Sequence, residues 1–340
     1  MQEIIQNPLW WHHQKEDAMV WIDLWLRRLG AQYKEADCDE TVNGHSCLFK
    51  LSTAIGVLYF KACRQFPLEE HRTIFSSEVY LTQILACAFP QSLPDVIAIE
   101  PERQWMLLRE SGSLVLRDRP VRAVWKHTLE SFAQLQVASL SFTSLLLHEG
   151  CADRCLNHLV DDFEEVLNEP EIWSQTCLSV REYFYRSLPL LHCLCEQLAD
   201  VPVPVATLVH GDLHAGNITL HQDHPVFLDW SDGCIAHPFF DAVIFLARLG
   251  RLKQQNNARH MLQNTYLAAW QSYASPVQLA QAMRLAEVLA CVHQVVSCRT
   301  LLGQEEPWKQ EMHDGLKYWV KTLLERLQLI SSLAFSAKCP

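Results

Sequence analysis

The sequence lacks an excess of positive charge. Its 340 residues include 28 Lys and Arg against 39 Asp and Glu, which gives a formal net charge of −11. Proteins that bind nucleic acid or anionic membranes usually present a basic surface to the phosphates. We therefore expect neither nucleic acid nor a membrane as a partner.

Long apolar runs and a secretory leader are also missing. The sequence contains no run of about 18 or more consecutive apolar residues, the length that a membrane-spanning helix needs. The first six residues do not combine a basic segment with an apolar run. We therefore expect a cytoplasmic protein. The 13 cysteines are an odd number and are scattered, mostly in apolar helical runs, which predicts reduced core thiols.

What is present is the composition of a globular protein. Apolar residues make up 49% and charged residues 20% of the chain. At about 150 residues per domain, the length suggests two domains. The pattern of predicted elements places them at 1–110 and 111–340.

The first region predicts a small antiparallel sheet with helices. Apolar periodicity favours an amphipathic helix over 17–29. Two strand-like runs, 46–51 and 57–62, flank a loop of small residues and predict a β-hairpin. A helix over 77–89 and strands at 96–99 and 105–109 follow. The segment 110–113 then serves as the connector.

The second region is predicted to be almost wholly helical. Helical patterns run over 120–147 and 182–198, and the last hundred residues predict three or four more helices, including 277–302 and 307–333. The helical pattern is interrupted sharply at Val201-Pro202-Val203-Pro204.

The most informative segment follows this interruption. It reads HGDLHAGN over residues 210–217, and Asp229 ends a later predicted strand. An Asp, an Asn five positions later and a second Asp match the catalytic loop and metal-binding Asp of protein kinases in order and spacing. Phosphoryl transfer needs one carboxylate facing the acceptor hydroxyl and oxygen ligands facing magnesium. Asn217 and Asp229 suit that hard cation.

These residues resemble the aminoglycoside phosphotransferase and choline-kinase-like family, whose pattern His-Gly-Asp-x-His-x-x-Asn is complete here. The resemblance continues over 229–241, which looks like the family's metal-binding turn and following helix. It implies an α+β, two-lobed protein kinase-like fold, with a small antiparallel-sheet lobe and a large, mainly helical lobe. It also implies ATP-dependent transfer of the γ-phosphoryl group to a hydroxyl of a small molecule.

The resemblance also implies a role for each motif residue. Asp212 would be the catalytic base, and Asn217 and Asp229 would bind Mg²⁺. His210 and Asp241 would brace the loop, Asp241 by accepting backbone hydrogen bonds.

The N-terminal region offers three further candidates. Lys61 ends the second hairpin strand, where a kinase-like fold carries its phosphate-contacting lysine, and Glu78 at the start of the next helix would be its partner. The Ser46 hydroxyl and nearby backbone amides would approach the phosphates from loop 41–46. The alternatives are a solvated lysine, a glutamate favoured by the helix dipole, and a plain β-turn.

Two other functions compete with a kinase. Asp-x-His with a nearby Asn also occurs in metallophosphoesterases, but Ile218 follows Asn217 where those enzymes have a Gly-Asn-His run. The second rival is a catalytically silent kinase-like protein that binds nucleotide or a partner. Such proteins usually lose the catalytic Asp, the metal Asp or the lysine, and all three are present here.

Two polar clusters remain outside the motif. His148, Cys151, Cys155 and His158 have spacings that suggest zinc ligands on one helical face, but one straight helix cannot surround a tetrahedral ion, so we interpret them as structural. The acidic run over 161–171 would favour a cationic acceptor if it lined the cleft, and is otherwise a solvated face. The acceptor's identity and the oligomeric state do not follow from these motifs.

Overall fold

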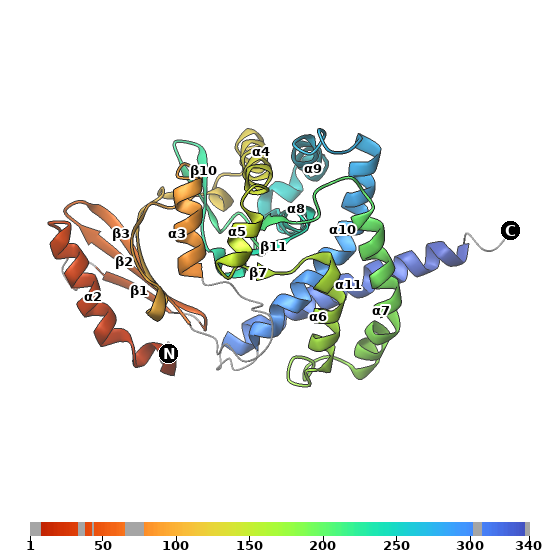
Figure 1. Cartoon of the computed structure of the whole chain (residues 1–340), viewed down its shortest axis with the longest axis horizontal. Helices are drawn as coiled ribbons and strands as arrows, with labels where there is room; N and C mark the ends of the chain where they lie inside the picture. The colour runs from red at the N-terminus through yellow and green to blue at the C-terminus, as the bar shows by residue number, and fades with distance from the viewer. Residues whose placement is uncertain (1–7, 33–37, 43, 65–77, 302–307, 337–340) are drawn as a thin grey trace. The chain divides into compact units, whose positions relative to one another are not determined.

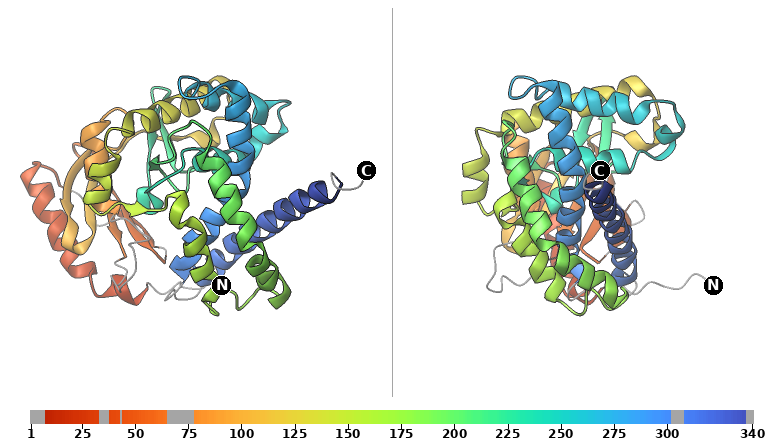
Figure 2. Two further views of the ribbon diagram at one scale, coloured as in Figure 1. Left: turned by 45° about the vertical axis from the view of Figure 1, so that its right-hand side comes forward. Right: turned by 90° about the vertical axis from the view of Figure 1, so that its right-hand side faces the viewer.

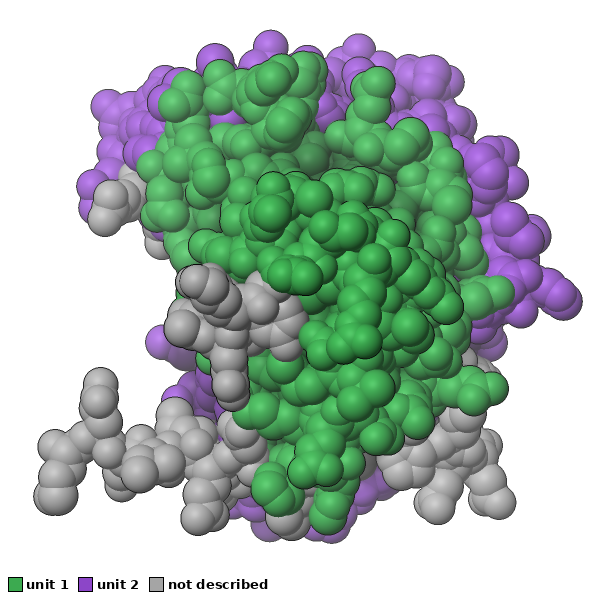
Figure 3. Space-filling model, turned by 90° about the vertical axis from the view of Figure 1, so that its left-hand side faces the viewer, with its two compact units in different colours: residues 1–71, 76–119, 216–231 green, residues 72–75, 120–215, 232–340 purple. Residues whose placement is uncertain are grey.

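The computed structural model describes residues 8–32, 38–42, 44–64, 78–301 and 308–336 (Figure 1; Figure 2). The chain divides into two compact units, coloured separately in Figure 3. Unit 1 comprises Met1–His71, Ser76–Arg119 and Gly216–Ser231, and unit 2 comprises Arg72–Phe75, Pro120–Ala215 and Asp232–Pro340. The chain thus returns to unit 1 at Gly216, near the end of the 210–217 motif.

Unit 1 is built on a five-stranded antiparallel sheet with strand order β1-β2-β3-β5-β4. The strands are β1 (Cys38–Val42), β2 (Ser46–Thr53), β3 (Gly56–Cys63), β4 (Val96–Glu100) and β5 (Trp105–Arg109). β2 and β3 form the predicted hairpin, in which Thr53 pairs with Gly56 at the turn. A short 3₁₀ turn, η2 (Pro101–Arg103), joins β4 to β5.

The sheet lies between two helices (Figure 1). Side chains alternate between the two faces of the sheet, so each face can pack against one helix. α2 (Lys15–Arg28), which follows α1 (Leu9–His12), packs its buried Ile22 onto the face that carries Phe60 and Trp105. α3 (Glu78–Ala88) packs Val79 onto the opposite face, which carries Cys63 and Met106. Lys61 lies two residues before Cys63 and therefore shares the face covered by α3.

A second small sheet explains why Gly216–Ser231 belongs to unit 1. β9 (Ile218–His221) and β10 (His224–Phe227) form a hairpin, and β9 also pairs with β6 (Leu114–Val115), which precedes η3 (Leu116–Asp118). Gly112 has φ +135°, and a Cβ there would lie 2.4 Å from the Leu220 carbonyl oxygen. The sequence predicts domains 1–110 and 111–340, whereas this pairing carries unit 1 to Arg119 and brings the later hairpin into it.

Unit 2 is mainly helical, and α10 (Pro276–Ser297) is its central helix. α10 packs against α6 (Leu156–Asn168), α7 (Leu178–Ala199), α8 (Phe239–Ala247) and α11 (Trp308–Ser336) (Figure 2). The other helices are α4 (Arg122–Ser139), α5 (Thr143–His148) and α9 (Ala258–Ala268), with 3₁₀ turns η5 (Gly250–Gln254) and η6 (Cys298–Leu301). A three-stranded sheet in the order β7 (Ala152–Asp153), β11 (Cys234–Ala236) and β8 (Thr207–Val209) leads into the motif.

Among the described helices, α10 alone is long and apolar enough to cross a membrane by length and composition. However, 72% of its apolar window is buried inside the protein. A mostly buried helix of this kind is typical of the core of a globular domain.

The structure changes three local predictions. The helix predicted over 120–147 is two helices, because the chain turns at residues 140–142 between α4 and α5. Thr41 and Val42, assigned to a loop, belong to β1 and pair with β2. The segment 148–158 is not one helix, since β7 separates the end of α5 from the start of α6.

Candidate active site

Lys61, near the end of β3, is held by two carboxylates. Its Nζ atom lies 2.7 Å from Glu78 Oε1 and 2.8 Å from Asp229 Oδ1, all within unit 1. Burial alone would lower the pKa of Lys61, but the carboxylates of Asp229 and Glu78 outweigh it and raise the pKa well above its ordinary value. Lys61 is therefore a fixed positive charge at a defined place.

Cys63, which the motif analysis did not single out, completes this cluster. Its buried Sγ lies 3.2 Å from Glu78 Oε2, so each carboxylate oxygen of Glu78 has a partner. Burial raises the pKa of the Cys63 thiol well above its ordinary value, which leaves it a neutral S–H donor. A period of two along β3 puts Cys63 on the face of Lys61, and that signal was available in the sequence.

Asp229 stands at a strained backbone position beside Asn217. Its φ of +65° is uncommon for a residue other than glycine. The hairpin of β9 and β10 closes with a hydrogen bond from the Leu228 amide to the Asn217 carbonyl, 2.9 Å, which makes Asn217 and Asp229 neighbours. The Asp229 side chain is 45% exposed, and its Oδ1 also accepts a hydrogen bond from Ser231 Oγ at 3.2 Å.

Ser46 begins β2 and pairs with Cys63 across the strands. The preceding residue, His45, is half-buried, and burial together with the nearby Arg64 lowers its pKa to about 4. A neutral imidazole therefore stands next to Ser46 at physiological pH. Asn43, in the predicted phosphate-facing loop, lies outside the described residues.

Asp212 lies in unit 2 and is held by Arg248 and His214. Arg248, which follows α8, donates to Asp212 Oδ1 at 2.5 Å, and His214 Nε2 lies 3.4 Å from Oδ2. The Asp212 side chain is 31% exposed. Burial pushes its pKa up, but the His214 hydrogen bond and the Arg248 guanidinium outweigh that effect and hold the pKa below its ordinary value. Asp212 is therefore an ionised carboxylate, as a proton acceptor must be.

Buried polar groups brace the loop beneath Asp212. The Asp241 carboxylate accepts the backbone amides of His210 at 2.7 Å and Gly211 at 3.0 Å. The Asp212 amide points to His210 Nδ1 at 3.4 Å, and Gln294 donates to the Gly211 carbonyl at 2.6 Å. His210 and Asp241 are fully buried. They therefore act on the shape of the loop.

Gly211 is the residue that this loop shape requires. Its φ is +82°, and a Cβ at this position would lie 2.3 Å from the backbone oxygen of Asp232. Any other residue would have to move the Asp232 backbone. The glycine in the motif therefore has a steric reason.

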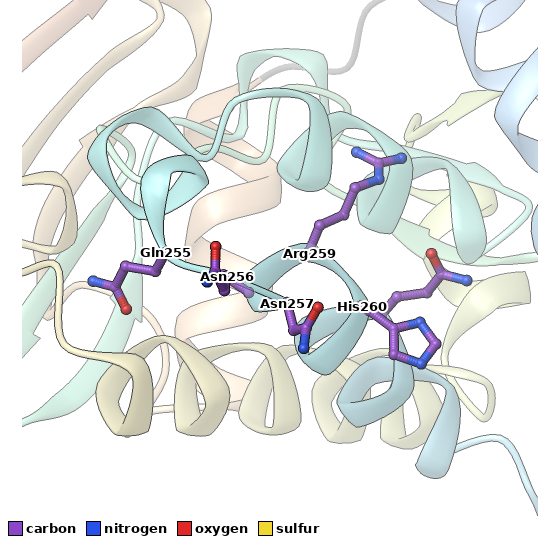
Figure 4. Close-up of a pocket in the computed structure, with 7 residues that line it drawn as sticks. Gln255, Asn256, Asn257, Arg259 and His260 are labelled. Atoms are coloured by element: carbon purple, nitrogen blue, oxygen red, sulfur yellow. The ribbon is translucent and has the colours of Figure 1, made fainter.

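A polar pocket in unit 2 contains none of these residues. Gln255, Asn256, Asn257, Ala258, Arg259, His260 and Gln263 line it, at the start of α9 (Figure 4). Figure 4 shows amide, guanidinium and imidazole groups from one turn and the first part of one helix. We assign it no part in the candidate chemistry.

The two other polar clusters from the sequence are also placed in unit 2. In the acidic run, Glu165 pairs with Arg299 at 2.7 Å and Glu171 pairs with Lys309. His148 and His158 lie on different helices. Within the described part of the chain, no group of three or more His, Cys, Asp and Glu is arranged to hold a metal.

Comparison with known families finds one match. The model of the "Phosphotransferase enzyme family" matches residues 161–276. This range contains the 210–217 motif, Asp229 and Arg248, while Lys61 and Glu78 lie outside it. No curated protein sequence matches the chain significantly.

Solved structures of small-molecule kinases share the fold. A choline kinase from Cryptosporidium parvum has a TM-score of 0.61 at 9% identity, covering 87% of this chain and 92% of that one. An ethanolamine kinase from Plasmodium vivax has a TM-score of 0.59 at 13% identity, covering 86% and 82%. An aminoglycoside phosphotransferase solved with ADP and hygromycin B has a TM-score of 0.55 at 12% identity, covering 88% and 97%.

Identities this low establish the fold and nothing finer, so the predicted α+β protein kinase-like fold is confirmed. The family match adds the sequence relationship over the motif itself. Together they confirm the resemblance: this chain is similar to the phosphotransferases of the aminoglycoside phosphotransferase and choline kinase group.

Proposed function

We propose that this protein is a cytoplasmic small-molecule kinase that transfers the γ-phosphoryl group of ATP to a hydroxyl, with Asp212 as the base. The family match and the shared fold support a small-molecule phosphotransferase. The observation that carries the finer proposal is the Lys61 cluster. A buried lysine held 2.7 Å from Glu78 and 2.8 Å from Asp229 is the pair of contacts that a kinase needs to hold a nucleotide's phosphates.

The unit 1 residues would bind the nucleotide. Lys61 supplies positive charge to the phosphates, Glu78 fixes the direction of the lysine, and Ser46 offers a hydroxyl donor. The aminoglycoside phosphotransferase with this fold holds ADP in its structure, which supports a nucleotide as the phosphoryl donor.

Asp229 and Asn217 would hold magnesium. The donor set fits, because carboxylate and amide oxygens suit this hard cation and the nucleotide supplies further oxygens. The Asp229 side chain is 45% exposed, and the end of the β9–β10 hairpin brings Asp229 beside Asn217. When bound, the metal would neutralise phosphate charge, and the Lys61 hydrogen bond would hold the Asp229 carboxylate in place.

Asp212 in unit 2 would receive the acceptor's proton. The acceptor oxygen forms a bond to the γ-phosphorus, the bond from that phosphorus to the ADP oxygen breaks, and the hydroxyl proton moves to Asp212. Asp212 is ionised, and the braced loop fixes its direction. His210 supports the reaction through the loop and does not touch substrate.

The first test is magnesium-dependent nucleotide binding and slow ATP hydrolysis, before any acceptor is added. We expect Asp229→Ala to weaken MgATP binding at least about tenfold, because it removes a metal ligand and a partner of Lys61. We expect Asp212→Ala to bind MgATP normally and to lose about 10²- to 10⁴-fold in phosphotransfer rate.

Binding of neither ATP nor GTP with any divalent metal would overturn the proposal. Binding without hydrolysis, unchanged by Asp212→Ala, would instead support a silent kinase-like protein. Asp223→Ala is a matched control, because Asp223 lies in the same hairpin as Asp229 but pairs with Arg119 at the exposed turn. It should leave MgATP binding unchanged.

A further inference from the structure

Arg248 is the residue beside the candidate base that the motif does not explain. It caps α8, and its Nη1 donates to Asp212 Oδ1 at 2.5 Å. It lies 36 residues from Asp212 in sequence, so no local pattern predicts the contact. Its side chain remains 36% exposed, so part of it is open to solvent.

The surroundings of Arg248 hold it in place beside the base. The guanidinium carbon lies 6.0 Å from the centre of the Trp319 ring on α11, and Trp319 is buried. α8, from which Arg248 emerges, is buried along nearly its whole length. An arginine fixed by a buried helix and an aromatic ring is a preorganised site for an anion, because its planar fork matches carboxylate and phosphate oxygens.

The local charges do not favour a cationic acceptor. Asp212 is already paired with the Arg248 guanidinium, so its negative charge is offset. The acidic run, which a cation would use, has Glu165 paired with Arg299 and Glu171 paired with Lys309. A cation brought to the Asp212 oxygen would lie within a few ångströms of the Arg248 guanidinium.

We infer that the acceptor carries an oxyanion, a carboxylate or phosphate, next to its reacting hydroxyl, and that Arg248 binds this group. The inference rests on the proposed kinase function. Without acceptor, Arg248 and Asp212 satisfy each other. When the acceptor binds, its oxyanion forms hydrogen bonds with the Arg248 guanidinium. The contact between Arg248 and Asp212 Oδ1 is then lost, and this oxygen can receive the hydroxyl proton. Binding of the correct acceptor therefore makes the base available.

The experiment compares related hydroxyl compounds in sets that each contain an anionic, a neutral and a cationic member. Three sets serve: glycolate, ethylene glycol and ethanolamine; glycerate, glycerol and 3-aminopropane-1,2-diol; glucose 6-phosphate, glucose and glucosamine. ADP formation with saturating MgATP gives kcat/KM for each compound, above the hydrolysis without acceptor. In at least one set we expect the anionic member to be preferred by about tenfold or more, the scale of one charge-assisted contact.

Variants assign the preference to Arg248. Arg248→Gln should remove most of the preference for the anionic member, mainly by raising the KM for that member. Arg248→Lys should keep part of the preference. Arg122→Gln is the matched control, because Arg122 is another unit 2 arginine, bonded to Gln255 and the Asn256 carbonyl away from Asp212. It should leave the preference unchanged. Thermal unfolding and MgATP binding check that each variant is folded.

Three results would overturn the inference. The first is a wild-type protein that prefers no anionic member, including one that uses a cationic member best. The second is an Arg248→Gln variant that keeps the preference. The third is an Arg248→Gln variant that slows all members of a set equally, which would make Arg248 a positioning residue for Asp212 alone. MgATP binding and hydrolysis by the wild-type protein would persist in all three, which distinguishes failure of this inference from failure of the proposed kinase function.

Discussion

The two charged clusters are built in opposite ways. In unit 1, two carboxylates enclose one cation, Lys61, whose side chain is 11% exposed. In unit 2, the Arg248 guanidinium and the His214 imidazole flank one carboxylate, Asp212, and both Asp212 and Arg248 are about one-third exposed. The first arrangement has two carboxylates for one cation, as the proposed magnesium site requires, and the second has a partly exposed arginine, as the proposed oxyanion contact requires.

Burial adds a second difference. Exchanging the partners of a buried ion pair costs much free energy, because breaking the pair leaves a charge that water cannot solvate. An exposed pair gives each group water as an alternative partner and contributes little to stability. The Lys61 cluster therefore suits a permanent element of the site, and the Asp212–Arg248 pair suits a contact that opens when substrate binds.

The largest expected effect separates the two clusters by stability. Lys61→Met leaves Glu78 buried without its cation, so the free energy of unfolding should fall by about 3–5 kcal/mol. Arg248→Met removes one partner of an exposed pair and should reduce it by no more than about 1 kcal/mol. Urea unfolding of both variants measures this difference. Equal losses would mean that the burial contrast has no energetic counterpart.

The second prediction concerns the buried carboxylate that braces the base. Burial raises the pKa of Asp241 from 3.8 to about 7, although the His210 and Gly211 amides act in the opposite direction. A raised carboxyl pKa contributes stability that is fully present below pH 3.8 and is lost as pH rises through about 7. The free energy of unfolding should therefore decline over this range, on the order of a few kcal/mol from this group.

Asp241→Asn isolates that contribution. The variant should be less stable, because Asn offers one acceptor oxygen where Asp offers two to the loop amides. Its unfolding free energy should also depend less on pH between about 4 and 7 than that of the wild-type protein. Parallel pH profiles for the two proteins would show that Asp241 does not titrate in this range.

The two clusters were not equally predictable from the sequence. The motif named Asp212, Asn217 and Asp229 because their spacing within one short segment is visible, and Lys61 with Glu78 followed from the kinase-like order of strand and helix. The antiparallel sheet was predictable from alternating apolar residues and turn composition. Arg248 was not, because its contact with Asp212 depends on how α8 ends in three dimensions.

The division into the two compact units was also not predictable from the sequence, because it depends on pairing between distant segments. The hairpin of β9 and β10 joins unit 1 through two residue pairs with β6, and a two-residue strand such as Leu114–Val115 has too little pattern to detect. The break between α4 and α5 was also hidden, since apolar periodicity continues across it. Non-local pairing and short elements were the main causes of error.

The third prediction tests whether Arg248 sets the protonation of the base. Arg248 and His214 hold the pKa of Asp212 below its ordinary value, against the effect of burial. The kcat/KM for the acceptor, which reports the free enzyme, should therefore fall on the acid side only below about pH 4, the ordinary range of Asp. In Arg248→Gln, burial is opposed only by His214 and His210, so this limb should move to higher pH, while Arg248→Lys should restore it. An unmoved limb in Arg248→Gln would contradict the electrostatic role.

The smallest expected effect lies in the permanent cluster, where Cys63 donates to the second oxygen of Glu78. Cys63→Ala leaves that oxygen with one partner fewer, and Glu78 gains freedom to turn away from Lys61. Because a thiol is a weak donor, KM for ATP should rise only about two- to fivefold, with kcat changed less. Cys63→Ser keeps a donor and should stay close to the wild-type value.

Cys47→Ala is the matched control for Cys63, since Cys47 is equally buried in the same sheet but faces α2. A rise in KM for ATP in both alanine variants would indicate a general loss of packing in unit 1. A rise in Cys63→Ala that serine reverses would mean that the orientation of Glu78 limits nucleotide binding. The unit 1 cluster would then comprise four residues, because the thiol fixes the carboxylate that fixes the lysine.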